Sequence, residues 1–208
     1  MMRVTRRDET SFGKARPGVQ ARIKLGMRRD GRITAVDIHA VGDSGPYGRS
    51  GDHMNVGVIG SLAYQPLAMR MRGTGVYTNT PPRGAQRAPG GEQSMTMLSP
   101  VIQKAAKQLD LDQVEVLRVN APAGQAVYGP PGLGGERSHV SSAFAREAID
   151  KGAEIFNWQE RVARSGERKG TKVTGVGVAL STFAAGASGV DGLFVLKPDG
   201  RLYIQSGI

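Results

Sequence analysis

Glycine and proline are so frequent in this chain that many turns must separate its helices and strands. The 208 residues include 30 glycines and 11 prolines, more than the roughly 7% and 5% of average usage. Apolar-periodic segments nevertheless remain between these breaks, so we expect many turns rather than disorder. Both strand-like and helix-like periodicities occur, which predicts an α+β fold of mixed sheets with flanking helices.

The clearest local signal is a β-hairpin over residues 20–42. Ile23, Leu25 and Met27 alternate with polar residues, and a second apolar run follows the turn at 28–32, where Gly31 accepts a positive φ. Pro100 either begins the next helix, with Ser99 as its cap, or kinks a longer one that starts near Glu92. The remaining patterns predict a strand over 69–77, helices over 98–109, 114–119 and 144–156, and strands over 173–183 and 193–204.

Composition excludes several classes of function. The sequence has no cysteine, which rules out disulfides, thiolate zinc sites, iron–sulfur ligation and a cysteine nucleophile. No run approaches 18 apolar residues, and the N-terminus has no apolar stretch typical of a secretory signal. We therefore expect a cytoplasmic protein that does not associate with membranes.

The formal charge of +10 raises the possibility of a nucleic-acid partner. Most basic residues are scattered, however, and the few aromatic residues do not interleave with them as stacking platforms would. One local cluster lies near the C-terminal third: Arg161, Arg164, Arg168, Lys169 and Lys172. Nucleic acid is thus disfavoured, and a basic module that binds RNA or another polyanion is kept as an alternative.

Motifs for metal-dependent or nucleophilic catalysis are missing from the sequence. His39, His53 and His139 each stand alone, without a ligand partner at the spacing that a metal site requires. No nucleophile elbow and no phosphate-binding loop signature occurs. We predict neither a metal ligand nor a catalytic residue within the chain.

The segment 78–93 has the composition of a ligand-binding loop. Its glycines let main-chain amides approach a ligand, its prolines fix its shape, and Arg83 and Arg87 supply charge. A helix is predicted to follow, with free N–H groups at its start. These features suit an anionic cofactor or an oxyanion, and they suit equally a plain surface turn that leads into a helix.

The loop resembles one in the molybdopterin-binding large subunit of the xanthine dehydrogenase/aldehyde oxidase family. Residues close to the family pattern are Asn79, Thr80, Ala85, Arg87, Gly90 and Gln93. Further segments resemble the family in the same order along the chain: 6–17, 27–36, 40–47, 64–70, 109–120 and 172–208. Each motif is modest, whereas the ordered set is fairly specific and covers nearly all of the sequence.

The resemblance implies an internal fragment of a two-domain subunit. Residues 1–120 would belong to the first molybdopterin-binding domain, 121–140 to a Gly/Pro-rich connection, and 141–208 to the helix and opening strands of the second domain. Such subunits hydroxylate a C–H carbon of an aldehyde or N-heterocycle with oxygen from water. The implied partners are the remainder of the subunit, iron–sulfur subunits, an optional FAD subunit and a small-molecule substrate.

The resemblance also assigns site residues. The molybdenum–molybdopterin cofactor would be partly contacted by Gly84, Ala85, Gln86, Arg87, Gly90 and Gly91, and the substrate pocket would include Gln86, Arg87 and Pro89. Gln86 and Pro89 depart from the family's aromatic residues, and Asn55 falls near its substrate-holding arginine, so purine-like specificity is in doubt.

Essential parts of the family's site would lie outside the chain. The general-base glutamate and the Gly-Gln-Gly cofactor segment are expected beyond Ile208, and another cofactor loop before Met1. We therefore expect the isolated chain to be inactive, and a non-catalytic truncated relic is the remaining alternative.

Overall fold

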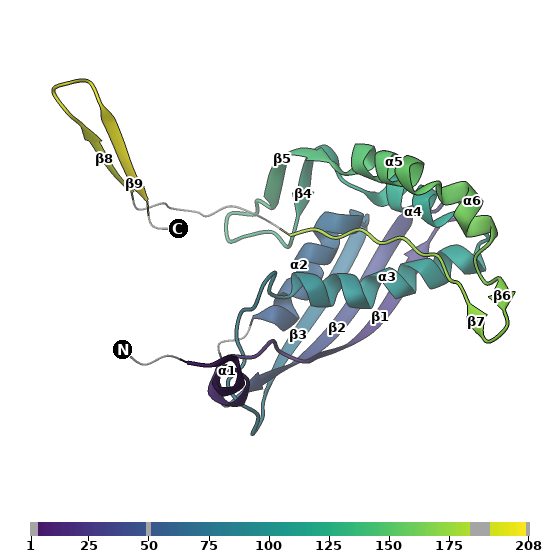
Figure 1. The fold of residues 1–208 in the computed structure, drawn as a ribbon, viewed down its shortest axis with the longest axis horizontal. Helices are drawn as coiled ribbons and strands as arrows, with labels where there is room; N and C mark the ends of the chain where they lie inside the picture. The colour runs from purple at the N-terminus through teal and green to yellow at the C-terminus, as the bar shows by residue number, and fades with distance from the viewer. Residues whose placement is uncertain (1–3, 49–50, 184–191, 207–208) are drawn as a thin grey trace.

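The computed structural model describes residues 4–48, 51–183 and 192–206. Within them a three-stranded sheet carries helices on one face, and three two-stranded hairpins are added (Figure 1). This arrangement confirms the predicted α+β class. The elements are α1 (Arg6–Phe12), β1 (Val19–Met27), β2 (Ile33–Gly45), α2 (Asp52–Tyr64), β3 (Ala68–Tyr77), α3 (Gly91–Gln108), α4 (Gln113–Asn120), β4 (Ala123–Tyr128), β5 (Ser138–Phe144), α5 (Ala145–Phe156), α6 (Trp158–Ala163), β6 (Arg168–Lys169), β7 (Lys172–Val173), β8 (Gly192–Leu196) and β9 (Leu202–Ser206).

The central strand of the main sheet is β2. It pairs antiparallel with β1, as the hairpin pattern predicts, and parallel with β3. A parallel pair needs a crossover connection, which α2 provides. The strands therefore follow the order β1-β2-β3, and the chain leaves β3 at Tyr77 directly into the 78–90 loop.

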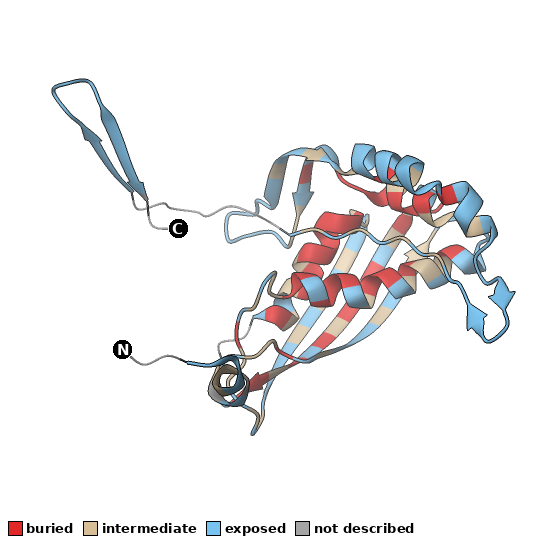
Figure 2. Cartoon of the chain, in the orientation of Figure 1, coloured by how far each residue is buried: buried red, intermediate tan, exposed pale blue. Residues whose placement is uncertain are grey.

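The hydrophobic core lies between this sheet and the helices. Alternate residues of β2, including Val36, Ile38 and Ala40, are buried beneath α2 and α3. Figure 2 shows the buried residues on α2, on the inner face of α3 and along β2. Period-2 burial on the strand and a buried stripe on α3 match the patterns in the sequence.

The predicted helices form with small differences at their boundaries. Of the two possibilities for Pro100, the structure has the long helix: α3 begins at Gly91 and contains Pro100. Pro100 is exposed, so the carbonyl that it leaves without an N–H donor lies on the solvent side. Asp112 caps α4 by accepting hydrogen bonds from the amides of Val114 and Glu115 at 2.7 and 3.2 Å.

One expectation about the C-terminal half needs correction. Residues 173–183 were expected to form a strand, yet only Lys172–Val173 pairs with another strand among the described residues. The rest of the segment is extended along α3, where the carbonyl of Val178 accepts a 2.7 Å hydrogen bond from the Gln103 side chain instead of a strand partner. The region 121–140, expected to be a connection, contains β4 and the start of β5.

The hairpin predicted within 193–204 forms as β8 and β9 and lies away from the sheet in Figure 1. The segment 172–208, which resembles the start of the second domain, includes residues 184–191 and 207–208, and these lie outside the described part of the chain. Among the described helices, none combines the length and apolarity needed to cross a membrane.

Candidate functional site

The loop that follows β3 lies against the N-terminal segment of the chain. Ala15 donates its amide to the carbonyl of Pro82 at 3.2 Å, and Gly84 donates its amide to the carbonyl of Ala15 at the same distance. Gly84 is buried, and a Cβ atom there would lie 2.8 Å from Cδ of Lys14. A side chain at position 84 would have to displace the Lys14 side chain, so this close approach favours glycine.

The entry to the loop is fastened to the end of β2 by Asp43. Its carboxylate accepts hydrogen bonds from the Thr78 hydroxyl at 2.5 Å, the Thr80 hydroxyl at 3.1 Å and Nε of Arg83 at 2.8 Å. Hydrogen bonds hold the pKa of Asp43 well below its ordinary value, and the bond from the Thr78 hydroxyl lowers it most. The Gly45 amide, Arg83 and Thr80 lower the pKa further, whereas partial burial of the carboxylate raises it. The carboxylate is thus ionised and fully engaged at neutral pH.

The exit of the loop is fastened to the start of α2 by Asp52. One carboxylate oxygen accepts hydrogen bonds from the Gly90 amide at 3.1 Å and from Nε2 of Gln93 at 3.0 Å. Asp52 is only 2% exposed, and both of these donors are neutral. Gly90 has φ +76, and a Cβ atom there would lie 2.4 Å from Cβ of Asn55, so another residue at this position would be strained.

Three arginines surround the loop, and two of them are paired. Arg83 pairs with Asp43, and Arg16 pairs with Glu92 at 3.0 Å. Arg16 also donates to the carbonyl of Arg87 at 2.7 Å. The Arg87 side chain is exposed, and no carboxylate of the described residues pairs with it. Its backbone is therefore held in place while its guanidinium is free to meet an anion.

Three amides at the start of α3, those of Gly90, Gly91 and Glu92, are used within the chain. Gly91 and Glu92 donate to the carbonyl of Ala88 at 3.0 and 3.3 Å, and Gly90 donates to Asp52 as above. The sequence predicts free N–H groups here, whereas the Ala88 carbonyl and the Asp52 carboxylate take up these three amides. Gln86 also turns toward the protein, since its Nε2 donates to the carbonyl of Lys14 at 2.8 Å.

Sequence reasoning proposed neither Asp43 nor Asp52 as a site residue. Both lie at the ends of the Gly-rich connection between β2 and α2, far from the loop in sequence. A single aspartate in a Gly-rich segment carries no signal of its own, and only the parallel crossover brings these residues to the loop.

Two of the three histidines contact strands of the main sheet. His39 contacts the Thr74 hydroxyl at 3.4 Å, and the ring of His53 lies close to Gly42, Gly73 and Gly75. No group of three possible metal ligands is found in the described residues.

The basic cluster of the sequence lies on α6 and the β6–β7 hairpin, at the far end of the molecule from α1 and the loop (Figure 1). Arg161 stacks over the ring of Phe156 at 4.7 Å, and Arg164 pairs with Glu167 at 3.3 Å. Two of its five basic side chains are therefore already engaged within the protein.

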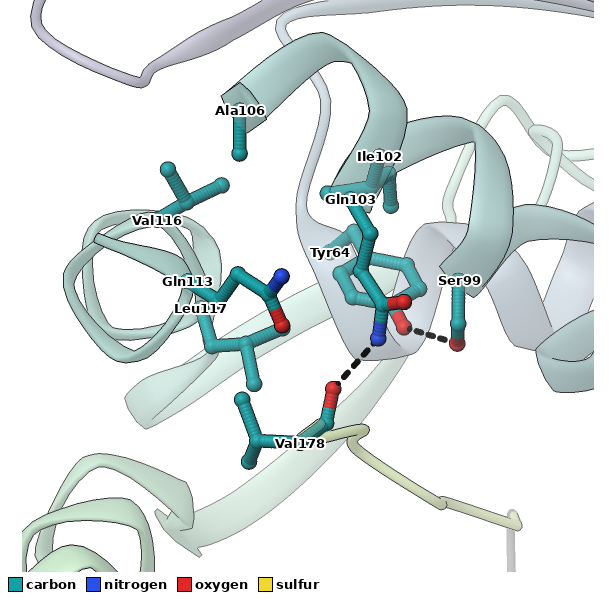
Figure 3. Close-up of a pocket in the computed structure, with 9 residues that line it drawn as sticks. All are labelled: Tyr64, Ser99, Ile102, Gln103, Ala106, Gln113, Val116, Leu117 and Val178. Carbon is teal, nitrogen blue, oxygen red and sulfur yellow. Dashed lines mark hydrogen bonds between the residues drawn. The ribbon is translucent and has the colours of Figure 1, made fainter. Parts of the chain in front are cut away.

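A cavity below α3 is too small to be the site. Tyr64 and Ser99, whose hydroxyls are 2.8 Å apart, line it together with Gln103 and Gln113 (Figure 3). Its volume is about 10 Å³, enough for roughly one water molecule. This cavity therefore cannot hold a cofactor.

Comparison with known proteins identifies the family. Residues 1–121, more than half of the chain, match the model of the molybdopterin cofactor-binding domain. The chain is 29% identical over 191 residues to the xanthine dehydrogenase molybdenum-binding subunit of Escherichia coli, covering 88% of this chain and 25% of that protein. It is 25% identical over 206 residues to the 6-hydroxypseudooxynicotine dehydrogenase complex subunit gamma of Paenarthrobacter nicotinovorans, covering 95% and 26%.

Solved structures share the fold. The aldehyde oxidoreductase of Desulfovibrio desulfuricans superposes with a TM-score of 0.72 at 23% identity, over 95% of this chain and 22% of that one. The aldehyde oxidoreductase of Desulfovibrio gigas gives 0.65 at 22% identity, over 92% and 21%. The chain spans about a quarter of the length of the curated relatives it matches. By the match of its residues 1–121, this chain belongs to the molybdopterin cofactor-binding domain family.

Proposed function

We propose that this chain supplies one cofactor-binding loop of a molybdenum hydroxylase large subunit. The whole enzyme would oxidise a C–H carbon of an aldehyde or an N-heterocycle with oxygen from water. The observation that carries the proposal is Arg87, a cation free of any described carboxylate on a loop whose backbone is fixed. An anionic cofactor suits such a position, because a fixed loop loses little conformational entropy when it binds.

The residues around the loop fit a polar, anionic cofactor. Oε1 of Gln93 and the hydroxyl of Thr182 are buried without a hydrogen-bond partner, and each belongs to a residue beside the Gly90–Gly91 turn. Buried polar atoms usually have partners. The Gln93 oxygen can accept from an N–H or O–H of a bound group or of water, and the Thr182 hydroxyl can also donate to an anionic oxygen. We propose cofactor contacts at Ala85, Gln86 and Arg87, with Gly84, Gly90 and Gly91 shaping the loop around the cofactor.

Main-chain donors toward the cofactor would come from the middle of the loop. The amides of Gly84, Gly90 and Gly91 are engaged within the protein, so residues 85–88 are the segment that can present N–H groups. The glycines instead provide the close packing that shapes the loop, and the Arg87 guanidinium provides the charge.

When bound, the molybdenum group supplies the redox step of the hydroxylation. The role of this chain is to bind and orient that group, while the general base and the second cofactor segment belong to the remainder of the subunit. Iron–sulfur and FAD subunits would accept the electrons. Without these parts the 208-residue chain is expected to bind cofactor without turning over substrate.

The substrate pocket would include Gln86, Arg87 and Pro89. Gln86 and Pro89 offer no ring to sandwich a flat purine. Asn55, at the position near the family's substrate-holding arginine, instead donates to the carbonyl of Pro89 at 3.3 Å. A small aldehyde or a non-purine heterocycle therefore fits these residues better than a purine.

Cofactor stoichiometry tests the proposal. The chain is produced in cells that make the cofactor, and molybdenum by mass spectrometry and pterin by fluorescence are measured per chain. We expect the wild type to retain both and Arg87→Ala to retain about tenfold less, as the loss of one charge-assisted contact implies. Arg29→Ala, an exposed arginine at the opposite end of β2, is the control. Equal retention by both variants would refute the assignment of Arg87.

Absence of pterin from the wild type, together with RNA binding that weakens steeply with salt, would favour the polyanion-binding alternative.

A further inference from the structure

Two carboxylates that lie outside the loop hold its two ends. Asp43, near the end of β2, binds Thr78, Thr80 and Arg83 at the entry. Asp52, the first residue of α2, binds the Gly90 amide and Gln93 at the exit.

We propose that Asp43 and Asp52 are positioning residues that together hold the 84–89 segment in the shape that receives the cofactor. This inference rests on the proposed function and adds to it two residues that touch the loop but not the cofactor.

Asp43 and Asp52 lie on the same part of the fold, which lets them hold the two ends of the loop together. They are close in sequence and belong to consecutive elements, β2 and α2, which pack against β3 and α3 in the core. Both ends of the loop are therefore tied to one rigid part of the fold. The ties in between are the Ala15 main-chain pair, the Gln86–Lys14 bond and the Arg16 bond to the Arg87 carbonyl.

The two braces differ in chemistry, which allows them to be told apart. Asp43 faces the guanidinium of Arg83, so its negative charge is part of the contact. One carboxylate oxygen of Asp52 accepts the hydrogen bonds from Gly90 and Gln93, and both of these donors are neutral. An asparagine at position 52 can keep both bonds through its amide oxygen, whereas an asparagine at position 43 brings an N–H₂ group toward the donors around it.

Hydrogen exchange of the full chain tests the inference without any cofactor. We expect Asp43→Asn and Asp52→Ala to accelerate exchange of the amides in 84–90 by about tenfold or more, while Asp52→Asn stays within about twofold of wild type. The matched control is Asp37→Asn, which removes the ion pair of another β2 aspartate with Arg70 and should leave the loop unchanged.

Cofactor retention gives the second readout. Pterin content should fall in Asp43→Asn and stay at the wild-type level in Asp52→Asn and Asp37→Asn. If Asp52→Ala does not fold, the comparison of Asp43→Asn with Asp52→Asn still tests whether the two aspartates position the loop.

Unchanged exchange of 84–90 in Asp43→Asn, or equal acceleration across the α3 core, would overturn the inference. If the wild type holds no pterin, the proposed function fails. The exchange experiment then still tests whether Asp43 and Asp52 hold the loop.

Discussion

Asn120 is the buried polar residue whose removal should cost most stability. Its side chain is fully buried and joins α4 to the β1–β2 turn. Oδ1 accepts from the Ile33 amide at 2.9 Å, and Nδ2 donates to the carbonyls of Gly31 and Val116, both at 2.8 Å. Asn120→Ala leaves at least the Ile33 amide and the Gly31 carbonyl buried without partners. At about 1–3 kcal/mol for each of these two groups, the free energy of unfolding should fall by about 2–6 kcal/mol.

Urea unfolding followed by far-ultraviolet circular dichroism measures this loss. The midpoint should fall without a change in the slope, because the surface exposed on unfolding is unaltered. Asn120→Asp should lose a similar amount, since it places an acceptor against two carbonyls at nearly constant volume. The control Gln125→Ala, at an exposed position of β4, should stay within about 0.5 kcal/mol. A loss below about 1 kcal/mol in both Asn120 variants would refute the reasoning.

Three further predictions concern pH, backbone conformation and a helix cap. The folded-state pKa of Asp43 lies below its ordinary value, so the stability that its carboxylate contributes is complete above about pH 4 and is lost as pH falls toward the folded pKa. Asp43→Asn should therefore lower the free energy of unfolding at pH 7 and make it depend less on pH below about pH 4. An unchanged pH dependence on the acid side would contradict this. Gly90→Ala should cost about 1–3 kcal/mol or more in thermal unfolding because of the positive φ, whereas Gly134→Ala, with open space around it, should cost little. Trp158→Phe should cost about 1–2 kcal/mol in urea unfolding, because Nε1 donates to the Asp112 carboxylate at 2.9 Å; no loss would show that this bond adds nothing.

Much of the fold could be predicted because local patterns and tertiary packing agree. The β1–β2 hairpin has alternation and a glycine turn, and α4 has an aspartate cap, so each is specified by its own residues. The extended segment after Val173 was mistaken for a strand because apolar alternation predicts an extended backbone but not a pairing partner. Its half-buried residues pack on helices instead of in a sheet.

Only part of the candidate site could be predicted from the sequence. The glycines and arginines of the loop are visible as a motif, and residues 84–91 indeed form a loop that ends at the start of α3. The braces at Asp43 and Asp52 were not visible, because they depend on the β2–α2–β3 crossover that brings distant residues together. Likewise, charge counting could not show that Arg83 and Arg16 are paired while Arg87 is free.

The most direct test of cofactor binding by this loop is a hydrogen-exchange footprint of the 208-residue chain. Exchange is compared with and without molybdenum cofactor released anaerobically from a donor protein. The account predicts protection within 84–91 and none on the basic cluster at 161–172. Unchanged exchange in 84–91 at saturating cofactor, or protection confined to 161–172, would contradict it.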